Sequence, residues 1–164
     1  MIRHATRARN DGPDDRTLDD IILQDAKDAI SDGRPISLSY KITNVNRSVG
    51  TQVSGEIGYQ YGEEGLPEGT IELRFNGSSG QSFGTFLAPG VRLILTGEAN
   101  DYVGKGMSGG EIIIKAIAQR KYTPQDCIIL GNTVMYGATG GGALRERPRR
   151  GTLLRQELWR NRDR

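Results

Sequence analysis

The sequence is poor in the residues that enzymes most often use for chemistry. Its 164 residues include a single cysteine, Cys127, and a single histidine, His4. One cysteine excludes a disulfide within the chain and any metal site built from several of its cysteines. Cys127 lies in an apolar segment and is best interpreted as a small buried hydrophobe, while His4 lies in a polar stretch with no acid or thiol beside it. The sequence therefore predicts no catalytic residue, because no serine or cysteine has a candidate base.

Long apolar segments and a uniform charge are also missing. No segment approaches the ~20 apolar residues of a membrane span and no signal peptide is visible, so we expect a cytoplasmic protein without a membrane partner. The net charge of +2 is divided unevenly: residues 1–143 carry 14 basic and 17 acidic side chains, and residues 144–164 carry eight arginines and three acids. An acidic body beside a basic tail is not a basic face, so binding of nucleic acid through the tail is the weakest functional alternative.

Glycine, by contrast, is about twice as common as in an average protein, with 23 residues. Residues 77–142 alternate glycine-dense turns with short apolar strands. Leu73, Leu93 and Ile113 occupy equivalent positions 20 residues apart, and Val53 lies 20 residues before Leu73. A fixed period of this size predicts stacked units that bury their apolar faces against their neighbours. The predicted fold is therefore an all-β parallel β-helix, with an antiparallel barrel or sandwich as the alternative.

The glycines of the turns are predicted to have a structural role. A chain that turns often needs positive φ at many corners, and glycine adopts it without steric strain. The predicted structural turn positions are Gly80, Gly84, Gly97, Gly104, Gly106, Gly109, Gly110, Gly131, Gly137, Gly140 and Gly141.

The chain before the repeats has a different pattern. Residues 1–16 are polar and predict a linker or arm. Residues 17–31 predict a helix with one apolar face, because Thr17 can cap its beginning and Gly33 lies just past its end. Alternation with period two from residue 36 predicts a strand, and residues 45–57 are expected to continue the β coil. The expected domain spans residues 17–142.

One glycine pattern imitates a nucleotide site. Residues 104–109 match G-x-G-x-x-G, and Asp126 follows at nearly the spacing of a ribose-binding acid. That pattern binds a dinucleotide only where a helix follows, because the helix N-terminus holds the pyrophosphate. Residues 111–115 instead predict a strand. Residues 97–105 resemble a P-loop faintly, but Gly106 stands where a magnesium-binding serine or threonine is needed.

A second pattern that resembles a catalytic site is a pair of carboxylates. Glu98 and Asp101 lie close together in the sequence, but turn residues that accept hydrogen bonds from nearby amides are the simpler interpretation. We therefore predict no flavin, NAD or metal in this chain.

The glycine-rich segments resemble the C-terminal GXGXG domain of the glutamate synthase large subunit. The resemblance rests on Gly-Glu-Ala-Asn-Asp-Tyr-Val-Gly-Lys-Gly-Met-Ser-Gly-Gly-Glu at residues 97–111, on residues 80–87 and on residues 131–141. It covers roughly residues 9–141 and implies a right-handed parallel β-helix. It also implies a parent enzyme of ammonia assimilation that converts glutamine and 2-oxoglutarate into two glutamates.

The same resemblance implies that the chemistry lies outside this chain. In the family, a cysteine nucleophile, FMN and an iron–sulphur cluster belong to other domains, and nothing here matches those parts. The implied role is a non-catalytic structural domain, a truncated piece of the enzyme, whose partners are its other domains or subunits and which has no direct small-molecule ligand. The alternative is a separately encoded GXGXG subunit of a related enzyme such as N-methylglutamate synthase.

The pattern breaks after Gly142, where the chain becomes rich in arginine. We expect residues 143–164 to be a basic tail read out of frame, since permitted codons shifted by one base encode a sequence similar to the family's next repeat. The expected consequence is an unpaired strand edge near residues 134–141, with residues 153–159 forming at most a short amphipathic helix. DNA sequencing of the locus tests this, and a shifted frame without glycine-rich continuation would contradict it.

Overall fold

The computed structural model describes residues 16–117, 129–149 and 152–160. Within this part of the chain there are two helices and six strands. In chain order these are α1 (Leu18–Asp32), β1 (Ile36–Ile42), α2 (Thr51–Tyr61), β2 (Ile71–Ser79), β3 (Val91–Ala99), β4 (Glu111–Lys115), β5 (Gly142–Arg149) and β6 (Thr152–Arg160).

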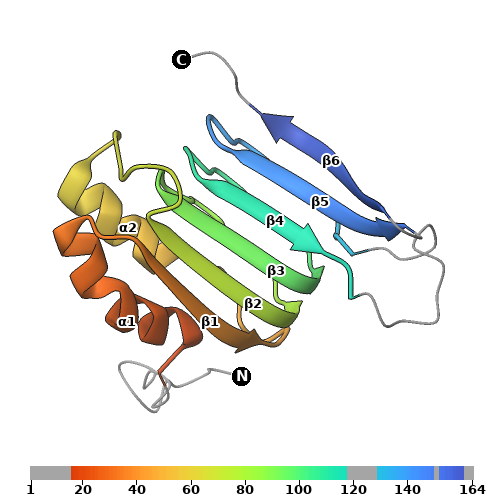
Figure 1. The fold of residues 1–164 in the computed structure, drawn as a ribbon, viewed down its shortest axis with the longest axis horizontal. Helices are drawn as coiled ribbons and strands as arrows, with labels where there is room; N and C mark the ends of the chain where they lie inside the picture. The colour runs from red at the N-terminus through yellow and green to blue at the C-terminus, as the bar shows by residue number, and fades with distance from the viewer. Residues whose placement is uncertain (1–15, 118–128, 150–151, 161–164) are drawn as a thin grey trace, which may run out of the picture.

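The strands form one sheet whose spatial order follows the chain order (Figure 1). Strands β1 to β5 pair in parallel, and β6 runs antiparallel to β5. Leu73 of β2 pairs with Leu93 of β3, as the period of 20 requires, whereas Ile113 of β4 pairs with Ile94. The pairing of β2 with β3 thus follows the period, and the pairing of β3 with β4 is shifted from it by one residue.

The predicted all-β, right-handed parallel β-helix is nevertheless wrong. The described residues form an open sheet of five parallel strands with two helices, an α/β-like arrangement that is neither closed nor curled. The physical reason lies in the return half of each unit. Residues 80–90, 100–110 and 131–141 form turns rather than strands, so they build no second sheet on which a coil could close.

Residues 51–61 also depart from the predicted β coil, since they form α2. Val53, Ile57 and Tyr61 are four residues apart, which places them on one helical face. Val53 and Ile57 are fully buried, and the Tyr61 hydroxyl donates to the Ile30 carbonyl of α1 at 2.6 Å. Burial of this face against α1 outweighs the two glycines within α2, each worth about 1 kcal/mol against a helix.

Helix α1 has the capping residues from which the sequence predicted it. Thr17 is the N-cap, and it exchanges hydrogen bonds with Asp20 in a capping box. Gly33 ends the helix with φ 62°, and its N–H donates to the carbonyls of the last turn. Ile22 and Ile30 are fully buried on the face of α1 that points toward the sheet.

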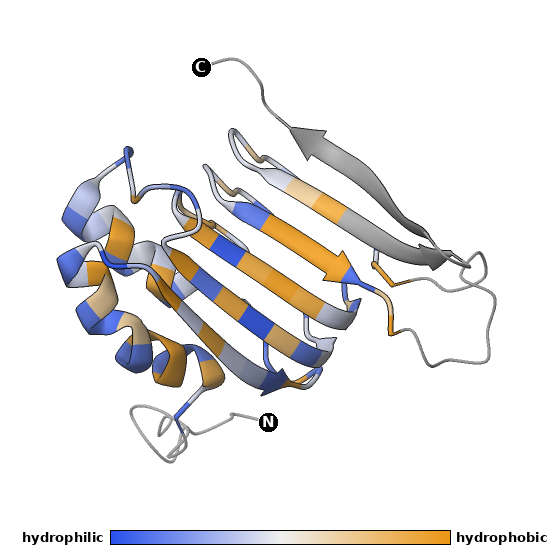
Figure 2. Ribbon diagram, in the orientation of Figure 1, coloured by the Kyte–Doolittle hydropathy of each residue, from blue (hydrophilic) through white to orange (hydrophobic). Residues whose placement is uncertain are grey.

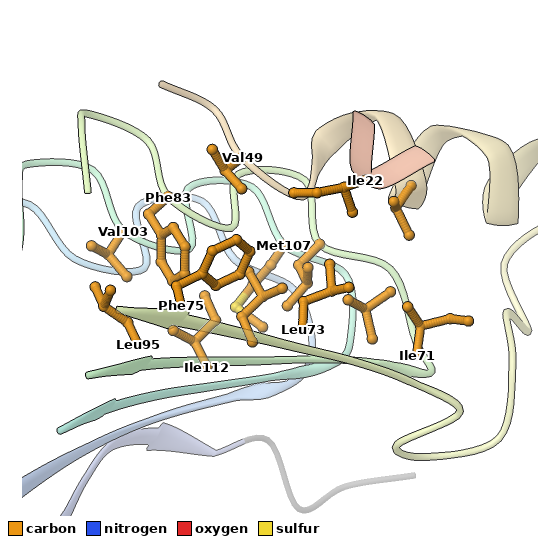
Figure 3. Close-up of a cluster of buried hydrophobic side chains, with 14 of the residues drawn as sticks. Ile22, Val49, Ile71, Leu73, Phe75, Phe83, Leu95, Val103, Met107 and Ile112 are labelled. Carbon is orange, nitrogen blue, oxygen red and sulfur yellow. The ribbon is translucent and has the colours of Figure 1, made fainter. Parts of the chain in front are cut away.

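One apolar core lies between the sheet and the layer of helices and turns that covers it (Figure 3). The strands contribute alternate residues, and Figure 2 shows this alternation along β2 and the hydrophobic middle of β4. The Phe75 ring of β2 meets the Phe83 ring of the turn layer edge-on, with 5.4 Å between the ring centroids. The largest fully buried side chains of the described strands are Ile71, Leu73, Leu93, Leu95, Ile112 and Ile114.

The C-terminal part of the described chain forms two strands, where the sequence predicted at most a short helix. Strand β5 pairs in parallel with β4 and continues the sheet. Residues 134–141, where an unpaired strand edge was expected, form a turn and not a strand. Residues 152–160 form β6 and not an amphipathic helix. Ala143 and Leu144 of β5 are buried, which explains why the sheet continues past the glycine-rich repeats: two apolar side chains there add to the sheet.

Candidate functional site

The turns that cover the sheet follow one conformational pattern. Positive φ recurs at every second residue, three times in succession, and the pattern repeats along the chain. It occurs at Ser82, Gly84 and Phe86, at Tyr102, Gly104 and Gly106, and at Thr133, Met135 and Gly137, and it begins at Ser48 and Gly50. We call these four segments (48–50, 82–86, 102–106 and 133–137) tiers, and together the turn stack.

Backbone hydrogen bonds join each tier to its neighbours in alternating directions. We number the positive-φ residues of a tier as its first, second and third positions. The N–H groups at the first and third positions donate toward the following tier, and the N–H at the second position donates to the preceding tier. The first-position bonds go to the residue just before the following tier: Ser48 to Gln81 (3.0 Å), Ser82 to Asp101 (2.9 Å) and Tyr102 to Asn132 (3.1 Å). The second-position bonds are Gly84 to Val49 (3.0 Å), Gly104 to Phe83 (2.9 Å) and Met135 to Val103 (2.8 Å). The third-position bonds are Phe86 to Lys105 and Gly106 to Tyr136 (both 2.8 Å). Each inner tier is therefore hydrogen-bonded on both sides.

The side chains between these positions fill the core. Val49, Phe83 and Val103 each follow the first residue of a tier, and all three are buried at 1 % exposure or less. Figure 3 shows them pointing from the turns toward the strands, together with Met107. The turn stack is thus a second layer of the protein rather than the lining of a binding cleft.

Two of the predicted turn glycines have different physical reasons. A Cβ on Gly97 of β3 would lie 1.7 Å from the Gly77 carbonyl oxygen, which is a backbone atom of β2. The φ of Gly97 is 151°. A Cβ on Gly104 would meet only side-chain atoms, first the Met135 sulfur at 2.6 Å, so the φ of 66° is the stronger reason for glycine there.

The remaining predicted glycines divide into two groups. Positive φ is found at Gly84, Gly106, Gly110, Gly137 and Gly141. The φ of the others is not positive, but an added Cβ would come within 2.5 Å of a neighbouring atom, at Gly80, Gly109, Gly131 and Gly140.

The G-x-G-x-x-G segment uses its backbone amides inside the turn stack. All six N–H groups from Gly104 to Gly109 donate to backbone carbonyls, at 2.8 to 3.2 Å. A phosphate cradle needs such groups free and aimed at one point. Strand β4 follows the segment, as the sequence predicts. Asp126, Cys127 and His4, the other residues weighed for chemistry, lie outside the described residues.

Glu98 and Asp101 have separate partners. The Glu98 carboxylate accepts from the Ser78 hydroxyl at 2.6 Å. The Asp101 carboxylate accepts from the Asn132 N–H at 2.7 Å, which links the third and fourth tiers. Asp101 is thus a turn residue that binds a nearby backbone amide. Among the described residues, no three His, Cys, Asp or Glu side chains are grouped closely enough to hold a metal ion.

Asp19 is a buried carboxylate whose contacts were not predictable from the local sequence. Its Oδ1 accepts from the Gly50 N–H at 2.6 Å, and its Oδ2 accepts from the Gln52 N–H at 2.8 Å. Gly50 occupies the second position of the first tier, and no tier precedes it. In the later tiers the N–H at this position donates to a carbonyl of the preceding tier. In the first tier the Asp19 carboxylate takes the place of that carbonyl. Burial raises the pKa of the Asp19 carboxyl above its ordinary 3.8, against the opposing effect of these amides. Asp19 therefore caps both the turn stack and α2.

The opposite face of the sheet carries paired charges. Glu72 of β2 forms ion pairs with Arg74 at 2.7 Å and with Arg92 of β3 at 3.8 Å, and Arg92 donates to Glu111 of β4 at 2.6 Å. Burial raises the pKa of Glu72, but hydrogen bonds from Arg74 and Ser37 and the charges of both arginines bring it below its ordinary 4.5. Glu72, Arg74, Arg92 and Glu111 thus form one group of paired charges on this outer face.

Comparison with known proteins identifies the repeat. A family model described as "GXGXG motif" matches residues 19–147 of the chain. The chain belongs to the GXGXG motif family. The match begins at Asp19 and extends to Arg147, five residues beyond Gly142, so it takes in most of β5.

The curated relatives of this GXGXG chain include several glutamate synthases. It is 49% identical over 130 residues to the glutamate synthase [NADPH] large chain of Bacillus subtilis, which is 79% of this chain and 9% of that protein. It is 51% identical over 126 residues to the ferredoxin-dependent glutamate synthase 2 of Synechocystis (76% and 8%), and 44% identical over 126 residues to the glutamate synthase [NADH] of Saccharomyces cerevisiae (77% and 6%). The chain therefore spans less than a tenth of the length of these relatives.

No helix among the described residues is long and apolar enough to cross a membrane.

Proposed function

We propose that this chain is a non-catalytic structural domain of a glutamate synthase, the cytoplasmic enzyme that makes two glutamates from glutamine and 2-oxoglutarate. Its relatives are glutamate synthases of which the matched region is a small part. Its partners are the remaining domains or subunits of such an enzyme, which carry the nucleophile, FMN and iron–sulphur cluster.

The use of the turn-stack amides inside the fold carries this proposal. The glycine-rich segments are the part of the chain with the strongest resemblance to a ligand-binding loop. In residues 104–109 every N–H donates to a backbone carbonyl, and the Val103 and Met107 side chains are fully buried in the core. The N–H groups of residues 104–109 are thus used within the fold, which supports a structural role for this segment over the binding of a nucleotide.

A purification of the chain alone tests the first half of the proposal. We expect no flavin absorbance, no bound nicotinamide nucleotide or metal, and no glutaminase or glutamate synthase activity. A flavin spectrum that co-purifies in stoichiometric amount would contradict the proposal.

A chimera tests the second half. The 130 matched residues of the Bacillus subtilis large chain would be replaced by those of this chain. We expect the chimera to retain glutamine-dependent glutamate synthesis, because a structural domain of this similarity can replace its counterpart. A chimera that folds with its flavin bound but lacks activity would indicate that residues of this region act in catalysis.

A further inference from the structure

Three aromatic side chains of the turn stack are exposed. Phe86, Tyr102 and Tyr136 have exposed fractions of 59%, 40% and 64%. They belong to the second, third and fourth tiers. We call these three residues, with Lys105, the aromatic face.

Backbone contacts bring the members of this face together across tiers. The Phe86 N–H donates to the Lys105 carbonyl, and the Gly106 N–H donates to the Tyr136 carbonyl, both at 2.8 Å. The Lys105 ammonium lies 5.6 Å from the centre of the Tyr102 ring. A Cβ on Gly106 would lie 2.7 Å from the Phe86 ring, so this ring lies across the neighbouring tier. These contacts place the members of the aromatic face on three adjacent tiers of the turn stack.

Two of these residues have a backbone conformation that is uncommon for their residue types, and both are partly exposed. Phe86 has φ 52° and Tyr102 has φ 64°, a conformation that is unfavourable for a bulky side chain. The tier hydrogen bonds of the Phe86 and Tyr102 N–H groups impose this conformation. It leaves the Phe86 side chain 59% exposed and the Tyr102 side chain 40% exposed, so both present apolar ring surface that the described fold does not cover.

The other broad surface fits a partner less well. The outer face of the sheet presents Glu72, Arg74 and Arg92 in ion pairs, and desolvation of paired charges opposes docking. The most apolar side chain of β3 on that face, Ile94, is only 8% exposed. Protein interfaces are enriched in aromatic residues and poor in charged ones at their centre, so the aromatic face is the better candidate.

We infer that the aromatic face docks against an apolar surface of another domain of the glutamate synthase chain. This inference rests on the proposed function. The length of the relatives supports a partner surface within the same chain. The matched region is 6% to 9% of their length, so in those proteins more than nine-tenths of the chain lies outside it.

Photo-crosslinking in the Bacillus subtilis chimera tests the docking surface. Para-benzoylphenylalanine is introduced at position Phe86 or Tyr136, one residue at a time, so that an aromatic side chain stays in place. Matched controls carry it at Tyr59, an aromatic residue of α2 that is 89% exposed, and at Arg74 on the outer sheet face. Cross-linked peptides are then identified by mass spectrometry.

We expect cross-links from positions 86 and 136 to peptides outside the matched region, and none from positions 59 and 74. Cross-links from position 59 or 74 in place of 86 and 136 would overturn the inference and leave the proposed function standing. Cross-links from position 86 that join two copies of the chimera would overturn it in favour of self-association. No cross-link from any of the four positions would count against the proposed function as well.

Discussion

At some positions of this chain only glycine fits, because an atom of the neighbouring strand or turn occupies the place of a Cβ. Gly97 shows this most clearly, because the atom nearest to its missing side chain is the carbonyl oxygen of Gly77. That oxygen is part of the backbone of β2 and cannot rotate away as a side chain would. Ile42, Gly77 and Gly97 occupy one register position across β1, β2 and β3, so a displacement at one of them affects all three strands.

Replacement of Gly97 by alanine should therefore destabilise the protein. We expect Gly97→Ala to lower the free energy of unfolding by roughly 1–3 kcal/mol, since the new methyl group forces an off-minimum backbone. Gly58→Ala is the matched control, because this glycine lies in α2 with no atom within 4 Å of the added Cβ. The control should raise stability by about 0.5–1 kcal/mol. Urea denaturation of both variants measures the difference, and equal effects would contradict the steric explanation.

The capping of α2 and of the first tier by Asp19 is a feature of the elements. Two backbone N–H groups depend on one buried carboxylate, and α2 has no side-chain cap of its own. We expect Asp19→Ala to lower the free energy of unfolding by about 1–3 kcal/mol, the usual effect of leaving buried donors without an acceptor. Asp28→Ala on the exposed side of α1 is the control and should change stability little. Thermal unfolding of the two variants compares them, and a small effect of Asp19→Ala would show that water or another group replaces the carboxylate.

The elements also show how far the sequence could predict the fold. Local signals sufficed for α1, because Thr17 and Gly33 mark its two ends, and the 20-residue period anticipated the pairing of Leu73 with Leu93. The same period misled for Val53, which was aligned with the strands although it is four residues from Ile57 and belongs to a helix.

The candidate site was less predictable for two physical reasons. Asp19 bonds to groups 31 and 33 residues away, and no local pattern reports such a contact. The turn stack also holds Phe86 and Met135 at positive φ, a conformation that tertiary hydrogen bonds impose and that these residue types do not prefer. Glycine positions indicated where turns lie, but not that every second residue would share one conformation.

At the scale of the whole molecule, stability should depend on position within the turn stack. Each tier contacts chiefly its neighbours, which is typical of proteins that open from their ends. The amides of Gly104 and Met135 make equivalent bonds, at 2.9 and 2.8 Å, to the preceding tier. Gly104 lies in an inner tier, whereas Met135 lies in the last tier that the structure describes.

We therefore expect the Met135 amide to exchange with solvent deuterium faster than the Gly104 amide. Native-state hydrogen exchange followed by NMR measures both rates in one experiment. Equal protection of the two amides would show that the described fold opens only as a whole.

The spacing of the tiers has a consequence for the evolution of length in this family. The second and third tiers begin 20 residues apart, at Ser82 and Tyr102, but the fourth begins 31 residues after the third, at Thr133. The hydrogen bonds between the third and fourth tiers follow the same alternation as those between the second and third, although the spacing is larger. A change in the number of residues between β4 and the fourth tier is therefore compatible with this hydrogen-bond pattern. A single insertion inside a tier is different, because it would reverse the direction of every N–H that follows within it. Insertions and deletions among relatives should accordingly gather between Lys115 and Leu130 and avoid the tiers themselves.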